Sequence, residues 1–307
     1  MINEHCKPKV IVIGASKCGT TSLHYYLSHH PKIFLSSKKE LHFHSREGLM
    51  LNSGGPADKY KIRELCKDIK TYLRYYADAS SDQICMDISP SYLFFPEYSI
   101  NSIKNVCGPD TKIICIVRHP VDKIISQYTH LYFSGSETLD FANALENESK
   151  RKALGYSDMW LYRESGLMSD KIRQFKNSFK STLVLNLSDF SIDLDKTLNI
   201  IFDFIGVDCK EMKEYNPAVK NFNGLPKSKL ITKIFIEPNF FTYLLRRVIP
   251  QKIGKSVREW INNKNKGKRV EIDENLYKHL EYEFKNEIST LNELIDTKTT
   301  IGFKYLN

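Results

Sequence analysis

Short apolar runs alternate with amphipathic stretches along the first two thirds of the chain. Five runs are rich in β-branched residues and are bounded by glycine, proline or polar residues, which predicts buried strands. These runs are residues 9–14, 33–35, 84–86, 112–117 and 182–186. Apolar residues at helical spacing predict amphipathic helices between them, over residues 20–29, 97–106, 121–133, 167–179 and 190–205. This alternation predicts an α/β fold, in which a mostly parallel sheet has helices on both faces.

The length of 307 residues fits a single domain. We expect its core to occupy about residues 8–206. Near the C-terminus, residues 273–295 predict one further amphipathic helix, whose apolar stripe consists of Leu276, Leu280, Phe284, Ile288, Leu291 and Ile295. We expect the helical region of about 220–307 to complete a functional site that is built on the core.

The positive charge of the chain is concentrated in one segment. Residues 227–269 hold twelve lysines or arginines and two acids, which accounts for the whole net charge of +9. A basic segment of this kind favours an anionic partner nearby, such as a nucleotide, an acidic glycan or a lipid surface. A solvated basic face is an equal alternative. Because no aromatic-interleaved RNA motif accompanies the segment, we expect no nucleic acid partner.

Composition and targeting features favour a cytoplasmic protein. No apolar run is long enough to cross a bilayer, and residues 1–6 lack the apolar core of a secretion signal. The seven cysteines are odd in number and include no Cys-x-x-Cys pair, which is typical of reduced thiols. Aromatic residues and arginines mix in 231–250, so the basic 227–269 region could also form a peripheral membrane contact, with a packed surface helix as the alternative.

A glycine-bounded loop joins the first predicted strand to the first predicted helix. Such a loop directs backbone N–H groups and the positive end of the helix dipole at an anion. Its candidate anion-binding residues are Ser16, Lys17, Cys18, Gly19, Thr20, Thr21 and Ser22. The pattern is similar to a Walker A loop, but Thr20 replaces the usual lysine, and Lys17 lies three residues upstream. A lysine there suits a donor whose single 5′-phosphate carries the transferred group. The fold is therefore expected to be of the P-loop type.

A second candidate anion site follows the predicted strand 112–117. Arg118 ends the strand, Pro120 lies at the start of the next helix, and Ser126 follows on that helix. Arginine offers a two-pronged donor to phosphate oxygens, and a serine hydroxyl adds one more donor. We therefore expect Arg118 and Ser126 to bind a second phosphate together.

These segments resemble the motifs of sulfotransferases that use 3′-phosphoadenosine 5′-phosphosulfate (PAPS). Lys17-x-Gly19-Thr20-Thr21 resembles their 5′-phosphosulfate loop, and Arg118-x-Pro120 with Ser126 resembles their 3′-phosphate motif. Residues 38–43 resemble the Lys-Glu-x-x-Phe-Phe segment of the heparan-sulfate-type branch, and residues 87–92 resemble its Glu-Lys-Ser-Pro-x-Tyr segment. Ile88 stands where animal glycosaminoglycan enzymes usually carry lysine, and Lys123 replaces a common arginine. The first departure fits bacterial members of the family better.

The resemblance implies a function and roles for the site residues. It implies transfer of a sulfuryl group from PAPS to a hydroxyl or amine of an acceptor, with a glycan or glycolipid expected and no metal required. Lys17 would act at the bridging oxygen of the donor, the loop would hold the 5′-phosphate, and Glu40 would be the general base, with His42 as the rival. Lys266, Gly267 and Arg269 resemble a loop that closes over the 3′-phosphate in other members. Lys227 is an equal contender for that contact.

Two other function classes compete with this interpretation. A P-loop kinase or related phosphotransferase would share the first loop, although Thr20 in place of the Walker lysine argues against it. A non-catalytic nucleotide-binding protein would share both anion sites. Lys17, Arg118 and Ser126 argue against that class, because a silent protein has no need of a complete donor site.

Overall fold

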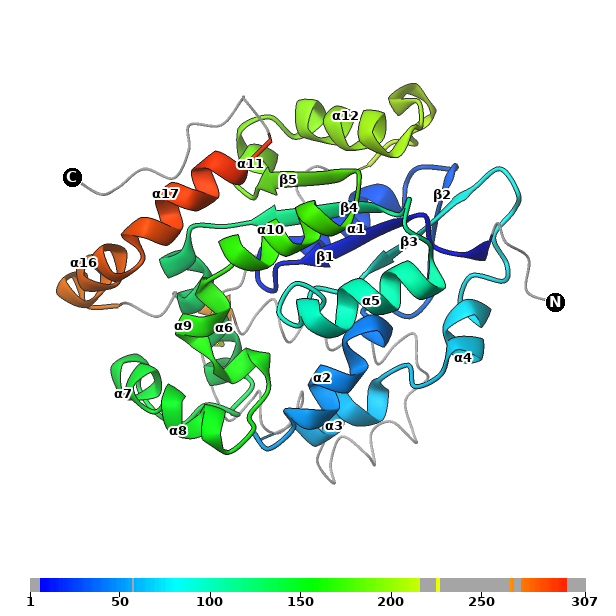
Figure 1. Ribbon diagram of the computed structural model, residues 1–307. Helices are drawn as coiled ribbons and strands as arrows, with labels where there is room; N and C mark the ends of the chain where they lie inside the picture. Colours follow the sequence, from blue (N-terminus) through cyan, green and yellow to red (C-terminus); the bar gives the residue numbers. More distant parts are fainter. Residues whose placement is uncertain (1–5, 57, 216–224, 227–265, 268–271, 297–307) are drawn as a thin grey trace.

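A five-stranded parallel sheet forms the centre of the molecule (Figure 1). The computed structural model describes residues 6–56, 58–215, 225–226, 266–267 and 272–296. The strands are β1 (Val10–Gly14), β2 (Ile33–Leu35), β3 (Ile84–Ile88), β4 (Lys112–Val117) and β5 (Thr182–Asn186). They lie in the order β2-β3-β1-β4-β5, and every neighbouring pair is parallel. The five predicted strands and their parallel arrangement are confirmed.

The strand order brings three predicted segments to one edge of the sheet. Strand β1 lies between β3 and β4, and its Val12 is in register with Ile88 on one side and Ile114 on the other. The carboxyl ends of the three strands are therefore adjacent. In open parallel sheets, ligands bind outside the carboxyl ends at the point where the strand order reverses. Strand β1 marks that point here.

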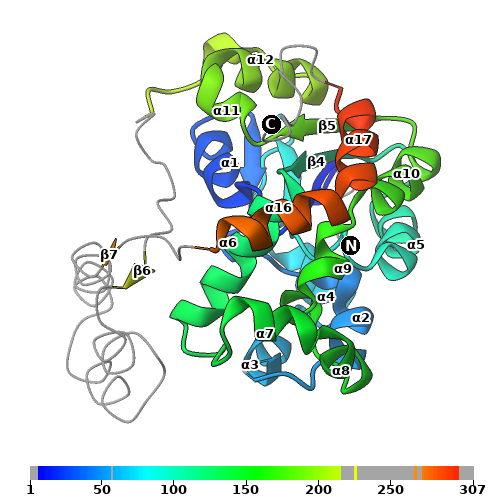
Figure 2. The ribbon, with the colours of Figure 1, turned by 90° about the vertical axis from the view of Figure 1, so that its left-hand side faces the viewer.

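Helices cover both faces of the sheet, as predicted. Helices α1 (Thr20–Leu27) and α12 (Leu194–Ile205) lie on one face, and α5 (Pro96–Val106) and α10 (Ser169–Ser178) lie on the other (Figure 2). Helix α6 (Pro120–Phe133) begins at the carboxyl end of β4. The helices shield the strands from water on both sides, which explains why the strands are apolar throughout instead of alternating.

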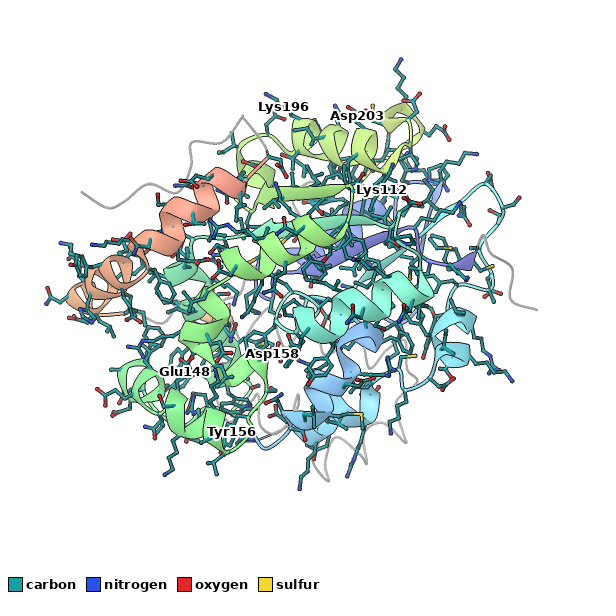
Figure 3. All side chains as sticks on the ribbon, in the orientation of Figure 1. Lys112, Glu148, Tyr156, Asp158, Lys196 and Asp203 are labelled. Atoms are coloured by element: carbon teal, nitrogen blue, oxygen red, sulfur yellow. The ribbon has the colours of Figure 1, made fainter. Side chains whose placement is uncertain are left out.

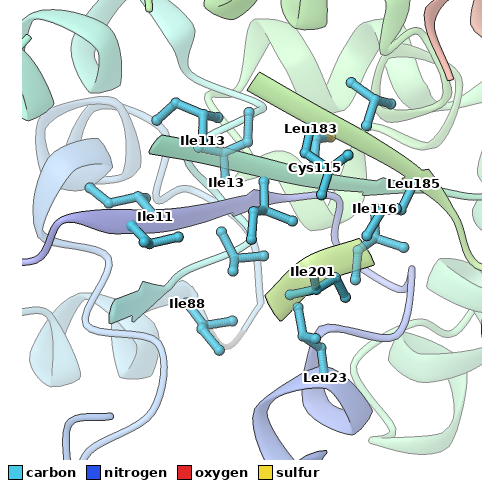
Figure 4. Close-up of a cluster of buried hydrophobic side chains, with 14 of the residues drawn as sticks. Ile11, Ile13, Leu23, Ile88, Ile113, Cys115, Ile116, Leu183, Leu185 and Ile201 are labelled. Atoms are coloured by element: carbon cyan, nitrogen blue, oxygen red, sulfur yellow. The ribbon is translucent and has the colours of Figure 1, made fainter. Parts of the chain in front are cut away.

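The main core lies between the sheet and these helices. Side chains such as Ile11, Cys115 and Leu185 from the strands meet Leu23 of α1 and Ile201 of α12 (Figure 4). Each is almost fully buried. Burial of an aliphatic side chain of this size stabilises the fold by about 2 kcal/mol. This core fixes the ends of the strands from which the site loops leave.

A group of shorter helices lies beyond the main sheet. They are α2 (Arg46–Leu51), α3 (Asp58–Glu64), α4 (Ile69–Arg74), α7 (Phe141–Glu146), α8 (Glu148–Ala153) and α9 (Tyr162–Gly166), with single 3₁₀ turns η2 (Phe43–Ser45), η3 (Asp158–Trp160) and η4 (Cys209–Glu211). The buried carboxylate of Asp58 accepts hydrogen bonds from the backbone and hydroxyl of Ser157 and from the indole of Trp160. Lys61 of α3 donates to Asp158, which Figure 3 labels, at 3.0 Å. These bonds hold α3 against the chain near 158.

Two predicted helices are each divided in two. The predicted helix 190–205 is α11 (Asp189–Ile192) followed by α12, because the side chain of Asp193 caps α12 by accepting from the N–H of Lys196. The predicted helix 273–295 is α16 (Glu274–Glu283) followed by α17 (Lys285–Leu294). The break at Phe284 lets α16 follow α6 and α17 follow α10. The predicted apolar stripe still forms the buried face, since Leu280, Phe284, Ile288 and Leu291 are buried.

Two searches bear on membrane and metal binding. Among the residues that the structure describes, no helix is both long and apolar enough to span a bilayer. Within the same described ranges, no group of three or more histidine, cysteine or acidic side chains is placed to hold a metal ion.

Candidate active site

The loop between β1 and α1 has the backbone of an anion-binding turn. Gly19 caps α1 with φ of 87°, and no described side chain caps the helix. The first-turn N–H groups of α1 therefore remain directed at the loop. A side chain at Gly19 would also approach Leu187 to 2.5 Å, so glycine is needed at this position for space as well as for its left-handed backbone.

The other predicted loop residues have different surroundings. Thr20 is buried in the first turn of α1, Thr21 is exposed, and Ser16 and Ser22 are half-buried. The Cys18 thiol is fully buried, and burial raises its pKa to about 11. The Cys18 N–H donates to the carbonyl oxygen of Ala15 at 3.1 Å. Cys18 therefore shapes the turn, and its thiol does not face a ligand.

Lys17 lies between the two other predicted ionic groups of the site. Burial lowers the pKa of its ammonium group, and the positive charge of Arg118 lowers it further, while the negative charge of Glu40 opposes both effects. Residues that are 101 positions apart in sequence thus come within electrostatic reach of one another. The sheet order explains this, because the loop after β1 and the loop after β4 leave neighbouring strands.

Arg118 and Ser126 are positioned by the junction of β4 and α6. Arg118 follows the last residue of β4 directly, and Pro120 begins α6. Ser126 is 9% exposed on this helix. The charge of Arg118 also influences the pKa values of Cys18 and Tyr277. Arg118 is therefore located between the β1–α1 loop and the C-terminal helix α16.

Helix α16 lies against the start of α6 next to Arg118. The ring of Tyr277 stacks over His119 with an interplanar angle of 8°, and its hydroxyl is 3.4 Å from Asp122. Glu281 lies 3.6 Å from the His119 ring. Burial lowers the pKa of His119, and the charge of Arg118 lowers it too, against the opposite effects of Asp122 and Glu281. The C-terminal region therefore supports the Arg118 loop, although it is more than 150 residues away in sequence.

Lys123, which replaces a common arginine of the resembling family, is a buried structural residue. Its ammonium group donates to Gln127 at 3.1 Å, and burial lowers its pKa to about 8. The Gln127 amide in turn donates to the carbonyl oxygens of Asp158 and Met159. This chain of hydrogen bonds anchors α6 to the 158–160 turn.

Glu40 and His42 form a polar pair in the loop after β2. The His42 Nε2 and Glu40 Oε2 atoms are 3.6 Å apart, and the side chains are 11% and 43% exposed. Burial alone would raise the pKa of Glu40. The hydrogen bond and charge of His42, with the charges of Lys61 and Lys39, more than compensate, so the pKa is lowered. Glu40 is accordingly a carboxylate that a ligand can reach.

A buried carboxylate holds this loop from behind. Asp87 of β3 accepts hydrogen bonds from the hydroxyls of Tyr72 at 2.9 Å, Tyr92 at 2.7 Å and Ser89 at 2.8 Å. The Ser89 oxygen then accepts the backbone N–H of His42 at 3.2 Å. The segment 87–92, which the sequence marked only by family resemblance, therefore fixes the backbone of the Glu40 loop.

The backbone at the three predicted catalytic residues is strained. Lys17, Glu40 and His42 have φ values of 67°, 54° and 52°. Within the described part of the chain they are the non-glycine residues with positive φ. Left-handed backbone is uncommon for residues with a side chain, and such strain concentrates at functional sites. Three residues from two separate loops thus share a feature that the sequence does not reveal.

Three further residues around Glu40 were not identified from the sequence. They are His24 of α1, Lys61 of α3 and His130 of α6. Burial lowers the pKa of both histidines to about 4, assisted by Lys39 at His24 and by Lys17 and Lys61 at His130. Both rings are therefore neutral at neutral pH. A signal for His130 existed, because it lies one helical turn after Ser126 and thus on the same face of α6.

The predicted C-terminal contacts are only partly described. Lys227 and Arg269 lie outside the described residues, as does the basic 227–269 region apart from Lys266–Gly267. Those two residues form β7, which pairs antiparallel with β6 (Leu225–Pro226). Strand β6 lies beside α6, the helix that carries Ser126. The backbone of the predicted Lys-Gly segment is thus near the Arg118–Ser126 motif.

Comparison with protein families gives one match over most of the described core. A model described as the sulfotransferase family matches residues 8–211. The crystal structure of a sulfotransferase from Alicyclobacillus acidocaldarius superposes with a TM-score of 0.73 at 24% identity. The superposition covers 94% of this chain and 96% of that one, which shows that the two proteins share a fold.

Two curated relatives carry more specific names. Carbohydrate sulfotransferase 15 of Mus musculus is 25% identical over 250 residues, which cover 66% of this chain and 44% of that protein. Heparan sulfate glucosamine 3-O-sulfotransferase 5 of Mus musculus is 27% identical over 183 residues, which cover 55% of this chain and 46% of that protein. The chain thus spans less than half the length of these relatives.

Proposed function

We propose that this chain, which belongs to the sulfotransferase family, transfers a sulfuryl group from PAPS to a hydroxyl or amine of a glycan or glycolipid. The observation that carries the proposal is the position of Lys17 between Arg118 and Glu40. A phosphate-binding arginine, a lysine and a reachable carboxylate in this order match what the reaction requires. The donor binds at one end, the leaving group departs at the centre, and the acceptor loses its proton at the other end.

The donor is held by the segments that follow β1 and β4. The N–H groups of the first turn of α1, with the hydroxyls of Thr20, Thr21 and Ser22, would bind the 5′-phosphate. Arg118 and Ser126 would bind the 3′-phosphate through a charge-assisted fork and a hydroxyl. That second contact separates PAPS from adenylates that lack a 3′-phosphate. We keep Ser16 and Gly19 as backbone contributors to the same loop.

The reaction itself is an in-line displacement at sulfur. The acceptor oxygen forms a bond to sulfur, while the bond between sulfur and the bridging oxygen breaks and its electron pair leaves with 3′-phosphoadenosine 5′-phosphate (PAP). Lys17 would stabilise the negative charge that develops on the bridging oxygen. Glu40 would take the acceptor's proton. Most of the rate enhancement then comes from positioning and charge stabilisation.

The acceptor class rests on the relatives. Two of them are named for carbohydrate and heparan sulfate substrates, which supports a glycan-type acceptor for this chain. Lys39 and Lys61 lie near Glu40 and would favour a glycan that carries negative charge. The sequence departure at Ile88 argues against a strict copy of the animal glycosaminoglycan enzymes.

The C-terminal region completes the proposal. Helix α16 already supports the Arg118 loop through Tyr277 and Glu281, and β7 lies near α6. We propose that Lys266 and Gly267, with Lys227 and Arg269, close over the 3′-phosphate. The chain would then act as one domain over residues 1–307, with no metal in the reaction.

A transfer assay tests the proposal directly. The purified protein is incubated with radiolabelled PAPS and a panel of acceptors: neutral oligosaccharides, uronic-acid-containing glycans with and without sulfate, and a glycolipid. We expect label on at least one glycan-type acceptor, together with stoichiometric PAP. The Lys17→Ala variant is the inactive control. Lys32→Ala, which removes an exposed ion pair with Asp82 at the amino end of β2, is the matched active control.

Two results would contradict the proposal. The first is the absence of both labelled acceptor and PAP across the panel with folded protein. The second is transfer of a phosphoryl group from ATP in the presence of Mg²⁺, which would favour the kinase alternative. Binding of PAP without any turnover would favour a non-catalytic nucleotide-binding protein.

A further inference from the structure

A line of buried hydroxyl groups continues inward from the Glu40–His42 pair. On its outer side, His42 Nε2 lies 3.6 Å from the Glu40 carboxylate. On its inner side, His42 Nδ1 lies 2.6 Å from the Ser91 hydroxyl, and Ser91 lies 2.7 Å from the Ser45 hydroxyl. Ser45 in turn donates to the backbone carbonyl of His42 at 3.5 Å. Ser45 and Ser91 are at most 1% exposed, so water does not compete for these hydrogen bonds.

The end of this chain determines the direction of every hydrogen bond in it. A carbonyl oxygen can only accept, so the Ser45 hydroxyl spends its single proton on the His42 carbonyl. The Ser45 oxygen then accepts from Ser91, and the Ser91 oxygen accepts from His42 Nδ1. The Nδ1 atom must therefore carry the proton in neutral His42. The Nε2 atom is left with a free lone pair, which faces Glu40.

We propose that Ser91, together with Ser45, is a positioning residue that fixes His42 as the Nδ1–H tautomer, so that His42 Nε2 receives the proton that Glu40 removes from the acceptor. The inference rests on the proposed role of Glu40 as the general base. The proton balance is simple. The acceptor O–H bond breaks as its oxygen bonds to sulfur, the proton passes to a Glu40 oxygen and then to Nε2, and the resulting imidazolium later returns it to solvent through Glu40.

The charges around Glu40 explain why a second proton acceptor is useful. Cationic side chains near Glu40, together with His42, lower its pKa despite burial. A carboxylate of that kind is easily reached but is a weak base, whereas an efficient base has a pKa near the working pH. An imidazole directly behind it would supply the missing basicity. The titratable groups that face the pair are Lys17, His24, Lys39, Lys61, His130 and, behind His42, Asp87.

The neighbouring histidine provides a matched comparison. His44 Nδ1 also meets a serine hydroxyl, that of Ser102, at 2.8 Å, and His44 Nε2 lies 3.1 Å from Tyr72. This second imidazole has the same kind of hydroxyl partner but points to Tyr72 and not to Glu40. Ser102→Ala is therefore the control for the loss of a buried hydroxyl beside a histidine of the same loop.

The tautomer is measured by long-range ¹⁵N–¹H correlation NMR of the histidine side chains, which needs no acceptor and no turnover. We expect His42 to show the Nδ1–H pattern in the full chain near neutral pH. We expect Ser91→Ala to shift it toward Nε2–H, and Ser91→Thr, which keeps the hydroxyl, to retain the original pattern. An Nε2–H pattern in the unmodified protein, or one unaffected by Ser91→Ala, overturns the proposal. Ser91→Thr keeps the test open if Ser91→Ala does not fold.

The kinetic consequence separates this proposal from the proposed function. With an acceptor identified by the transfer assay, Ser91→Ala should lower kcat about tenfold and move the acidic limb of the pH–kcat profile, while KM for PAPS and the Ser102→Ala profile stay as in the unmodified enzyme. Equal, pH-independent losses in both variants overturn the relay but leave the sulfotransferase function standing. If no transfer occurs at all, the proposed function fails, and the tautomer measurement still decides the direction of the hydroxyl chain.

Discussion

The donor side of the site, defined as residues 14–22 with Arg118 and Ser126, is built on backbone at the ends of strands. The acceptor side, defined as Glu40 and His42, is held by side chains that are buried behind it. Strands β1 and β4 carry the donor segments directly into α1 and α6. The acceptor loop instead depends on hydroxyls of segment 87–92. The donor side should therefore tolerate single substitutions structurally, whereas the acceptor side should respond to changes that never touch a ligand.

The largest expected effect is on the acceptor side. Glu40→Gln keeps the shape of the side chain but removes the base, so kcat for transfer should fall by about 10²- to 10⁴-fold. The affinity for PAP should remain within about threefold, because the donor contacts lie elsewhere. Steady-state kinetics and calorimetry check the two halves of this statement. Glu47→Gln, in an exposed pair with Arg46, should leave kcat unchanged. A Glu40→Gln enzyme with full activity would remove Glu40 from the mechanism.

The next effect belongs to the donor side. Lys17→Ala removes the charge that faces the bridging oxygen, and we expect kcat to fall by about 10²- to 10³-fold. The fold should persist, since the turn is formed by Gly19 and by the bond from Cys18 to Ala15. Single-turnover assays with PAPS, alongside thermal unfolding, distinguish lost chemistry from lost structure. A variant that unfolds would show that the donor side also depends on its side chains.

The smallest effect concerns stability and sharpens the description of the acceptor side. His44 is buried, and burial lowers its pKa to about 3. The unfolded chain, with a histidine pKa of about 6.5, therefore takes up the proton first as the pH falls. The stability that neutral His44 provides is complete above pH 6.5 and is lost between pH 6.5 and pH 3. Integration over pH 7 to pH 4 gives a loss on the order of 3 kcal/mol.

His44→Phe tests this linkage. The variant should be less stable than the unmodified protein at pH 7 by about 1–2 kcal/mol, because the hydrogen bonds to Ser102 and Tyr72 are lost. The deficit should shrink or reverse at pH 4, because the phenylalanine takes up no proton. Urea unfolding at the two pH values measures both differences. An identical pH dependence in the two proteins would mean that His44 does not contribute.

The same contrast explains what could be predicted from the sequence. The five strands and the donor motif were identified because both are local: β-branched runs mark the strands, and Lys17, Arg118 and Ser126 lie at fixed spacings beside them. Glu40 and His42 were identified by family resemblance. Their convergence with Lys17 follows from the strand order, which short-range patterns do not encode.

Other features depended on contacts between distant residues. Ser45 and Ser91 are 46 positions apart, and no spacing rule connects them. The periodicity of 273–295 predicted the buried stripe correctly but could not show the break at Phe284, because that break serves packing against α6 and α10. The break before α12 had a visible signal in Asp193, a capping residue three positions before Lys196.

The most direct test of the central claim is a calorimetric titration of the purified protein with PAP in the absence of Mg²⁺, with ATP as the comparison ligand. We predict tight binding of PAP, weak binding of ATP, and a loss of PAP affinity of about 30- to 1000-fold in Arg118→Ala. Absence of PAP binding, equal affinity in Arg118→Ala, or a preference for ATP with Mg²⁺ would contradict a PAPS donor site built from Lys17, Arg118 and Ser126.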